Sequence, residues 1–146
     1  MTYAQNRNHF NEYIEKNRRK ELHSVGVIYL DLNGLKEIND KMGHLAGDTL
    51  IIGASYVLQE IFADNSYRIG GDEFVVIEQD VLESEFMSKY NKLLVRMKEL
   101  EISVATGYIW KERCLNLSEI LQAADQKMYE DKKRYYSIAQ KDQRRR

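Results

Sequence analysis

The chain has 146 residues, of which 43% are hydrophobic and 31% are charged, a balance typical of one globular domain rather than of a disordered segment. Its net charge of −1 produces no overall positive potential, so we expect no nucleic-acid partner. Any phosphate binding must therefore come from a local site. No apolar run reaches the roughly 18 residues that a membrane span needs, and no signal peptide precedes Asn6. Cys114 is the one cysteine and cannot form an internal disulfide, which fits a reducing cytoplasm.

The first part of the chain alternates between helical and strand patterns. Phe10, Tyr13 and Ile14 follow helical spacing and indicate an opening helix. Residues 24–30 (SVGVIYL) are apolar on both faces, which predicts a central strand buried on both sides. Apolar residues at helical spacing then predict a second helix, and they are Leu50, Ala54, Val57, Leu58 and Ile61.

Two short strands follow, over residues 67–69 and 74–77, and they flank Gly70 and Gly71. Two glycines between two strands predict a two-residue hairpin, because such turns need positive φ. An apolar stripe over residues 82–100 then predicts a long helix that packs this stripe into the core. The stripe comprises Leu82, Phe86, Tyr90, Leu93, Met97 and Leu100.

A further strand is predicted over residues 102–110, with small residues on one face that let a helix or a neighbouring backbone approach closely. These small residues are Ser103, Ala105 and Gly107. The last helix is predicted to begin near Asn116, where Glu119 completes a capping-box-like pair. Its apolar face comprises Leu121, Ala124 and Met128.

This order of elements predicts an α/β (α+β) sandwich, in which a central, mostly antiparallel sheet is flanked by helices. The order of the strands stays open. We expect a single domain over residues 1–146, in which residues 137–146 form a polar, basic tail that ends in three arginines. Such a tail is usually a solvated segment.

Acidic residues follow two of the predicted strands. Asp31 stands at the carboxyl end of the central strand, where ligands commonly bind, and Asp72 and Glu73 follow the two glycines, which let a backbone approach phosphate closely. If the hairpin lies beside the central strand, Asp31 and Asp72 converge and can bind magnesium together with substrate phosphates. The alternative is that all three acids are solvated strand-end or turn residues.

The segment after the central strand, residues 31–48, adds an amide at Asn39 and a carboxylate at Asp48. An amide and a carboxylate can together hydrogen-bond a guanine edge, which offers both donors and acceptors. The alternative is that Asn39 and Asp48 cap short flanking helices. The residues alone leave this choice open.

Four segments in the same order resemble the GGDEF family of diguanylate cyclases. Residues 68–74 (RIGGDEF) match the signature of the family, and residues 31–48 resemble its second motif. Thr2, Asn6, Arg7 and Phe10 resemble the end of the opening motif, and residues 124–132 resemble the closing one. The resemblance covers about residues 2–136 and implies a sheet similar to the ferredoxin-like core of polymerase palms and nucleotidyl cyclases.

The resemblance also implies roles for individual residues. Asp31, Asp72 and the carbonyl of Leu32 would hold two Mg²⁺ ions per site, for which Mn²⁺ can substitute, and Glu73 would share the catalytic role with Asp72. Asn39 and Asp48 would read guanine. The phosphate contacts would come from Leu35, Lys36, Gly70, Gly71 and Lys132. The alternative for Lys132 is a cation that merely favours a helix C-terminus.

The chain departs from the family pattern at several positions. Asn33 replaces an acid, Gly34 a histidine or arginine and Leu35 a phenylalanine, and Tyr136 stands where an arginine usually contacts phosphate. Many members also carry an inhibitory product site, Arg-x-x-Asp. Here the aspartate is present as Asp64, but Ile61 takes the place of the arginine, so we expect the feedback site to be absent.

Together these features predict a cyclase that condenses two GTP molecules into cyclic di-GMP and two pyrophosphates across a transient homodimer. The opening motif is truncated at Met1, so we expect excision from a longer sensor protein, with the domain in the cytoplasm and its parent either membrane-anchored or not. Two alternatives remain: a catalytically silent GTP-binding sensor and a structural dimerisation module.

Overall fold

The computed structural model describes residues 4–144, with side chains as far as residue 140, so Thr2 and the final two arginines lie outside the described part. A short 3-10 turn, Ala63–Asn65, links α3 to β2. The helices and strands are, in chain order, α1 Arg7–Asn17, β1 Leu22–Leu32, α2 Leu35–Met42, α3 His44–Phe62, β2 Ser66–Arg68, β3 Glu73–Glu78, α4 Glu83–Glu99, β4 Val104–Cys114 and α5 Leu117–Arg144.

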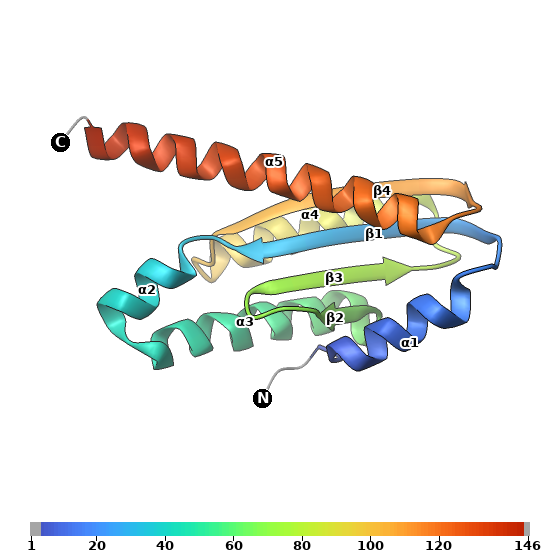
Figure 1. Ribbon diagram of the computed structural model, residues 1–146, viewed down its shortest axis with the longest axis horizontal. Helices are drawn as coiled ribbons and strands as arrows, with labels where there is room; N and C mark the ends of the chain where they lie inside the picture. Colours follow the sequence, from blue (N-terminus) through green and yellow to red (C-terminus); the bar gives the residue numbers. More distant parts are fainter. Residues whose placement is uncertain (1–3, 145–146) are drawn as a thin grey trace.

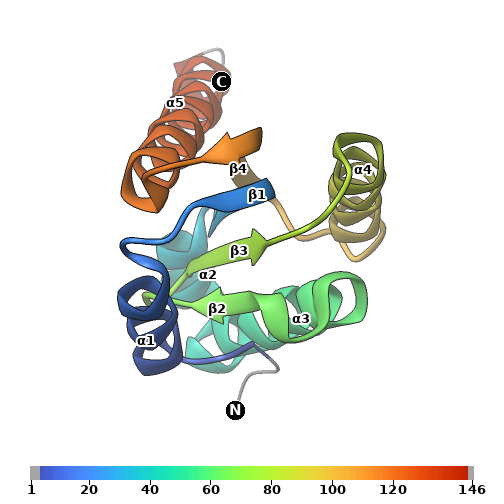
Figure 2. The same ribbon diagram turned by 90° about the vertical axis from the view of Figure 1, so that its right-hand side faces the viewer.

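The strands form one antiparallel sheet in the order β2-β3-β1-β4. Helices α1 and α5 cover one face of this sheet, and α3 and α4 cover the other (Figures 1 and 2). The predicted α+β sandwich with a mostly antiparallel sheet is therefore confirmed, and the strand order that the sequence left open is now defined.

The central strand β1 supplies side chains to both cores. Val25, Val27 and Tyr29 pack with α1 and α5, whereas Ile28 and Leu30 pack with α3 and α4. This burial on both sides explains why the segment is apolar at consecutive positions. Strand alternation also puts Asp31 on the same face as Tyr29, toward α5.

The small residues of β4 allow α5 to lie unusually close to the sheet. A Cβ added at Gly107 would lie 2.2 Å from the Ala124 carbonyl oxygen and 2.4 Å from the Met128 nitrogen. The prediction that small side chains here permit close approach of a helix is confirmed. The N-terminus of this helix is capped by Asn116, whose Oδ1 accepts a hydrogen bond from the Ser118 nitrogen at 3.1 Å.

The predicted two-residue hairpin at Gly70 and Gly71 is wrong. The loop between β2 and β3 has four residues, 69–72, and neither glycine has positive φ. The Ile69 nitrogen donates to the Glu73 carbonyl at 3.0 Å, and the Arg68 guanidinium donates to the carbonyls of Gly70 and Gly71 at 3.2 and 2.7 Å. These hydrogen bonds pair the backbone groups of a wider loop, and such a loop needs no residue in the left-handed conformation.

One further expectation needs correction. Leu82 and Leu100 are exposed and lie at the caps of α4, just outside the helix, so the buried part of the stripe is Phe86, Leu93 and Met97. Within the segment predicted as a polar, basic tail, residues 137–144 are helical, because α5 continues through them past the end of the sheet (Figure 1). Among the described residues, none of the helices combines the length and the apolar character that a membrane span requires.

Candidate active site

The pairing of β1 with β3 brings the strand-end acid and the signature acids together. Asp31 stands opposite Glu73 in the register, and the Leu32 nitrogen donates to the Asp72 carbonyl at 3.0 Å. Burial raises the pKa of Asp31 to about 6, and the neighbouring Asp72 carboxyl contributes to this rise, whereas Lys132 opposes it. The predicted convergence of Asp31 and Asp72 is therefore present in the structure.

Lys132 of α5 makes the closest contact with Asp31. Its Nζ lies 2.6 Å from Asp31 Oδ2, and the two side chains are only 22% and 11% exposed. Burial lowers the pKa of Lys132, but the hydrogen bond and the charge of Asp31 outweigh this and raise it overall. The other oxygen, Asp31 Oδ1, is buried and has no hydrogen-bond partner in the part of the chain that the structure describes.

Negative charge accumulates around this pair. Burial raises the pKa of Glu73, and the charges of Asp125, Asp31 and Asp72 raise it further. No three His, Cys, Asp or Glu side chains of the described residues form a ready-made metal site. Asp31 and Asp72 supply two carboxylates, which is the number that Mg²⁺ often takes from a protein when phosphates and water complete its shell.

The proposed guanine readers lie on two helices joined by Gly43, which has a φ of +88°. Asn39 is inside α2 and Asp48 is inside α3, whereas the N-caps of these helices are Gly34 and Gly43. Neither residue is therefore a helix cap, which removes the alternative raised by the sequence.

The amide of Asn39 faces α3 at a position without a side chain. A Cβ added at Gly47 would lie 1.9 Å from Asn39 Oδ1, so glycine is needed for this approach. The same oxygen is buried and has no hydrogen-bond partner among the described residues. Asp48 is exposed to solvent. A buried acceptor beside an exposed carboxylate suits a ligand that carries several N–H donors.

The proposed phosphate-binding residues lie at the start of α2, in the signature loop and on α5. Leu35 and Lys36 begin α2, where Leu35 packs partly on the core and Lys36 is exposed. Gly70 and Gly71 form the exposed middle of the signature loop. Lys132 is thus the proposed phosphate contact that already pairs with a carboxylate.

Two residues that support the site, Arg7 and Asp131, had no structural role in the predictions from the sequence. The Arg7 guanidinium donates to the Ile69 carbonyl at 2.5 Å and ties α1 to the signature loop. Asp131 accepts a hydrogen bond from the Thr106 nitrogen at 2.9 Å, which fixes α5 on β4 one residue before Lys132. The resemblance to the opening motif could have identified Arg7 as a residue of the site, whereas no sequence feature pointed to Asp131.

Where many family members carry the feedback site, this chain has an apolar residue and, three positions later, an acidic residue. Ile61 packs against the core formed with α3 and α4, and Asp64 is exposed and accepts a hydrogen bond from Gln5 Nε2 at 3.4 Å. The absence of product feedback stays a prediction.

Comparisons with known proteins agree on one family. The model of the family "Diguanylate cyclase, GGDEF domain" matches residues 1–136. The chain is 34% identical to the signaling protein YkoW of Bacillus subtilis, over 95% of this chain and 20% of that protein. It is 29% identical to the cyclic di-GMP phosphodiesterase PdeR of Escherichia coli, over 88% of this chain and 21% of that protein. The diguanylate cyclase DgcS of Shewanella oneidensis is 25% identical, over 90% of this chain and 48% of that protein.

A solved structure shows the same fold. The GGDEF domain of DgcB from Caulobacter crescentus, in complex with c-di-GMP, superposes with a TM-score of 0.75 at 20% identity, over 90% of this chain and 87% of that one. The chain spans between a fifth and a half of the length of the three curated relatives. By its sequence over residues 1–136 and by its fold, the chain belongs to the GGDEF domain family.

Proposed function

We propose that this GGDEF domain is a diguanylate cyclase, which condenses two GTP molecules into cyclic di-GMP and two pyrophosphates. The observation that carries the proposal is that the signature loop brings Asp72 beside the end of β1, where the buried Asp31 pairs with Lys132. This arrangement keeps the two acids that the reaction needs next to a cation. The family alone does not decide the activity, because one relative is named a cyclase and another a phosphodiesterase.

Magnesium fits the donors at this site. Asp31 has a buried oxygen that no described residue bonds, Asp72 adds a second carboxylate, and the carbonyl of Leu32 follows in the chain. Two bound Mg²⁺ ions would neutralise the triphosphate and make the ribose 3′ hydroxyl more acidic. The carboxyl group of Glu73 lies among Asp125, Asp31 and Asp72, whose charges raise its pKa, and a divalent cation would relieve this repulsion between acids.

The side chains of the protein then position the substrate. Asn39 and Asp48 would hydrogen-bond the guanine edge, and an acid at Asp48 favours guanine over adenine because it accepts from N1–H and N2–H groups that adenine lacks. Leu35 and Lys36 at the start of α2, together with the two signature glycines, would hold the phosphates. Lys132 would leave Asp31 and pair with phosphate oxygens instead.

Each domain would bind one GTP, so the reaction needs two copies facing each other. The 3′ oxygen of one GTP attacks the α-phosphorus of the other, a phosphorus–oxygen bond forms, and pyrophosphate leaves with the electron pair of the broken bond. The same step in the opposite direction closes the ring. Catalysis of this kind depends mainly on positioning and electrostatic stabilisation.

Incubation with GTP and Mg²⁺, followed by chromatography, tests the proposal. We expect cyclic di-GMP and pyrophosphate from the native chain and no product from Asp72→Asn, while a thermal melt shows that the variant stays folded. GTP binding without product from the native chain would favour the silent sensor. The absence of the usual phosphate-binding arginine at Tyr136 would fit that outcome. Neither binding nor product would favour the structural module.

A further inference from the structure

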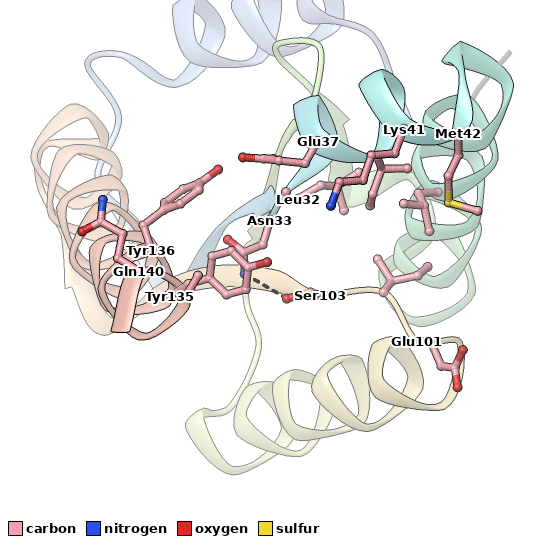
Figure 3. Close-up of a pocket in the computed structure, with 15 residues that line it drawn as sticks. Leu32, Asn33, Glu37, Lys41, Met42, Glu101, Ser103, Tyr135, Tyr136 and Gln140 are labelled. Atoms are coloured by element: carbon pink, nitrogen blue, oxygen red, sulfur yellow. Dashed lines mark hydrogen bonds between the residues drawn. The ribbon is translucent and has the colours of Figure 1, made fainter. Parts of the chain in front are cut away.

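A cavity lies between α2 and the C-terminal part of α5 (Figure 3), and it borders the proposed active site at Leu32 and Tyr136. Its volume of about 520 Å³ is within the range of small-molecule sites. Neither Asn39 nor Asp48 lines it, whereas Ala139 and Gln140 do, and both of these lie beyond the residues that the family model matches. Its apolar surface comprises Leu32, Ile38, Leu50 and Ile102.

The cavity depends on a glycine at the start of α2. Gly34 has a φ of +67°, and a Cβ added there would lie 3.3 Å from the Tyr135 hydroxyl and 3.7 Å from Glu37 Oε2. A Cβ here would therefore crowd the Tyr135 hydroxyl and contact Glu37, and a longer side chain would occupy part of the space between the helices. Tyr135 and Tyr136 form an edge-to-face pair, with ring centroids 5.2 Å apart, and both line the cavity on the α5 side.

Asn33 supplies a polar group that is buried in the wall of this cavity and is incompletely bonded. The residue is only 6% exposed. Its Nδ2 donates to Ser103 Oγ at 3.2 Å (Figure 3), but its Oδ1 has no hydrogen-bond partner among the described residues. Because a buried acceptor without a donor is destabilising, this oxygen points to a ligand with an N–H group.

Two opposite charges stand one turn apart above this acceptor. Glu37 and Lys41 extend from α2 and line the cavity (Figure 3). Glutamate four residues before lysine is a favourable arrangement for a helix ion pair, yet neither side chain makes an ion pair with a described residue. Glu101 lines the cavity as a second acid. A ligand can therefore meet both signs of charge here.

We propose that this cavity binds a small zwitterion with an apolar side chain, the chemistry of a free aliphatic α-amino acid. The ammonium group is held by Asn33 Oδ1 and Glu37, and the carboxylate by Lys41. The aliphatic side chain lies on the apolar surface. The two glutamates disfavour phosphates and other simple anions, and the three charged side chains make the site unsuited to a plain hydrocarbon.

Calorimetric titration of the whole chain with L-leucine tests the proposal. Two matched probes each lack one charge: 3-methylbutylamine lacks the carboxylate, and 4-methylpentanoate lacks the ammonium. We expect one saturable site for leucine and binding weaker by about tenfold or more for each probe, because each has lost a charge-assisted hydrogen bond. The Asn33 side-chain NH₂ resonance should move with the same saturation curve.

Variants locate the site. Glu37→Gln and Lys41→Met change exposed side chains, so we expect unchanged melting temperatures and leucine binding weakened by about fivefold or more. Lys92→Met on the exposed side of α4 is the control and should bind leucine normally. No saturable binding up to about 10 mM, equal affinity for the amine alone, or full affinity in Glu37→Gln would each overturn the proposal. None of these readouts depends on turnover of GTP.

Discussion

Replacement of Lys132 by methionine would remove the ammonium next to Asp31 and keep an unbranched side chain of similar length. In the native chain the Lys132 ammonium, with Nζ 2.6 Å from Oδ2, repels a metal ion at Asp31, and a metal ion that uses Oδ2 must displace this charged hydrogen bond. Hydrogen bonds to charged groups contribute about 1.5–3 kcal/mol. Without Lys132, this contribution no longer opposes metal binding in the absence of nucleotide.

Protonation of Asp31 limits the gain. Its pKa is already about 6 with Lys132 in place, and it rises further in Lys132→Met because the favourable positive charge has gone. If the variant protonates Asp31 fully, a metal at pH 7 must displace a proton rather than a lysine. Displacement of the proton offsets part of the contribution that the lost hydrogen bond made. The net gain is then on the order of 1 kcal/mol, or about fivefold in affinity.

Titration with Mn²⁺ in the absence of nucleotide, followed by calorimetry or by electron paramagnetic resonance, measures this affinity. We expect Lys132→Met to bind Mn²⁺ about fivefold more tightly than the native chain and to bind GTP more weakly, since the phosphates lose a cation. Lys133→Met is the control, because Lys133 is exposed and lies over the ring of Tyr129 rather than against an acid. Mn²⁺ affinity that is unchanged or lower in Lys132→Met would refute the competition between lysine and metal.

Four other perturbations test the site and the fold. The pKa of Asp31 is raised from 3.8 to about 6 in the folded state, so the folded chain binds a proton more tightly than the unfolded chain does. Without metal, the free energy of unfolding should therefore fall as pH rises from about 4 to 6. Urea denaturation should show a smaller fall in Asp31→Asn. Gly107→Ala should destabilise the chain by about 1–3 kcal/mol in the same assay, because its Cβ would meet the Ala124 carbonyl; an unchanged midpoint would contradict the close packing. Micromolar cyclic di-GMP should not bind at Asp64, since Ile61 offers no cation; tight binding that Asp64→Ala abolishes would show that the feedback site is present. Specific activity should rise with protein concentration, by mass action on a dimer, and a constant value across dilution of a monomeric sample would exclude the two-copy mechanism.

The sequence was most informative where one residue pattern has a single structural solution. A continuous apolar segment that ends in an acid predicts a strand buried on both sides, and β1 has this form with Asp31 near its end. The small residues of β4 predict close approach of another element, and α5 lies against Gly107. In both cases the packing requirement acts directly on the residues that carry the pattern.

The sequence was less informative where contacts outside the residue pattern decide the local structure. Two glycines suggested a tight turn, but the side chain of Arg68 bonds to both glycine carbonyls and supports a wider loop. Leu82 and Leu100 fit a helical stripe by spacing, yet they stand at the ends of α4, where the chain turns away from the core. Spacing describes the face of a helix but does not define where the helix stops.

The pairing of Lys132 with Asp31 follows from the topology rather than from any local pattern. The two residues are 101 positions apart, and they meet because α5 crosses the sheet along the face toward which Asp31 points. Asp131 anchors α5 to the Thr106 nitrogen in the neighbouring strand, so the position of Lys132 is set by the contact between β4 and α5. A change at the small residues of β4 would therefore shift Lys132 away from Asp31 without touching either side chain. The close packing at Gly107 therefore also determines whether Lys132 can pair with Asp31.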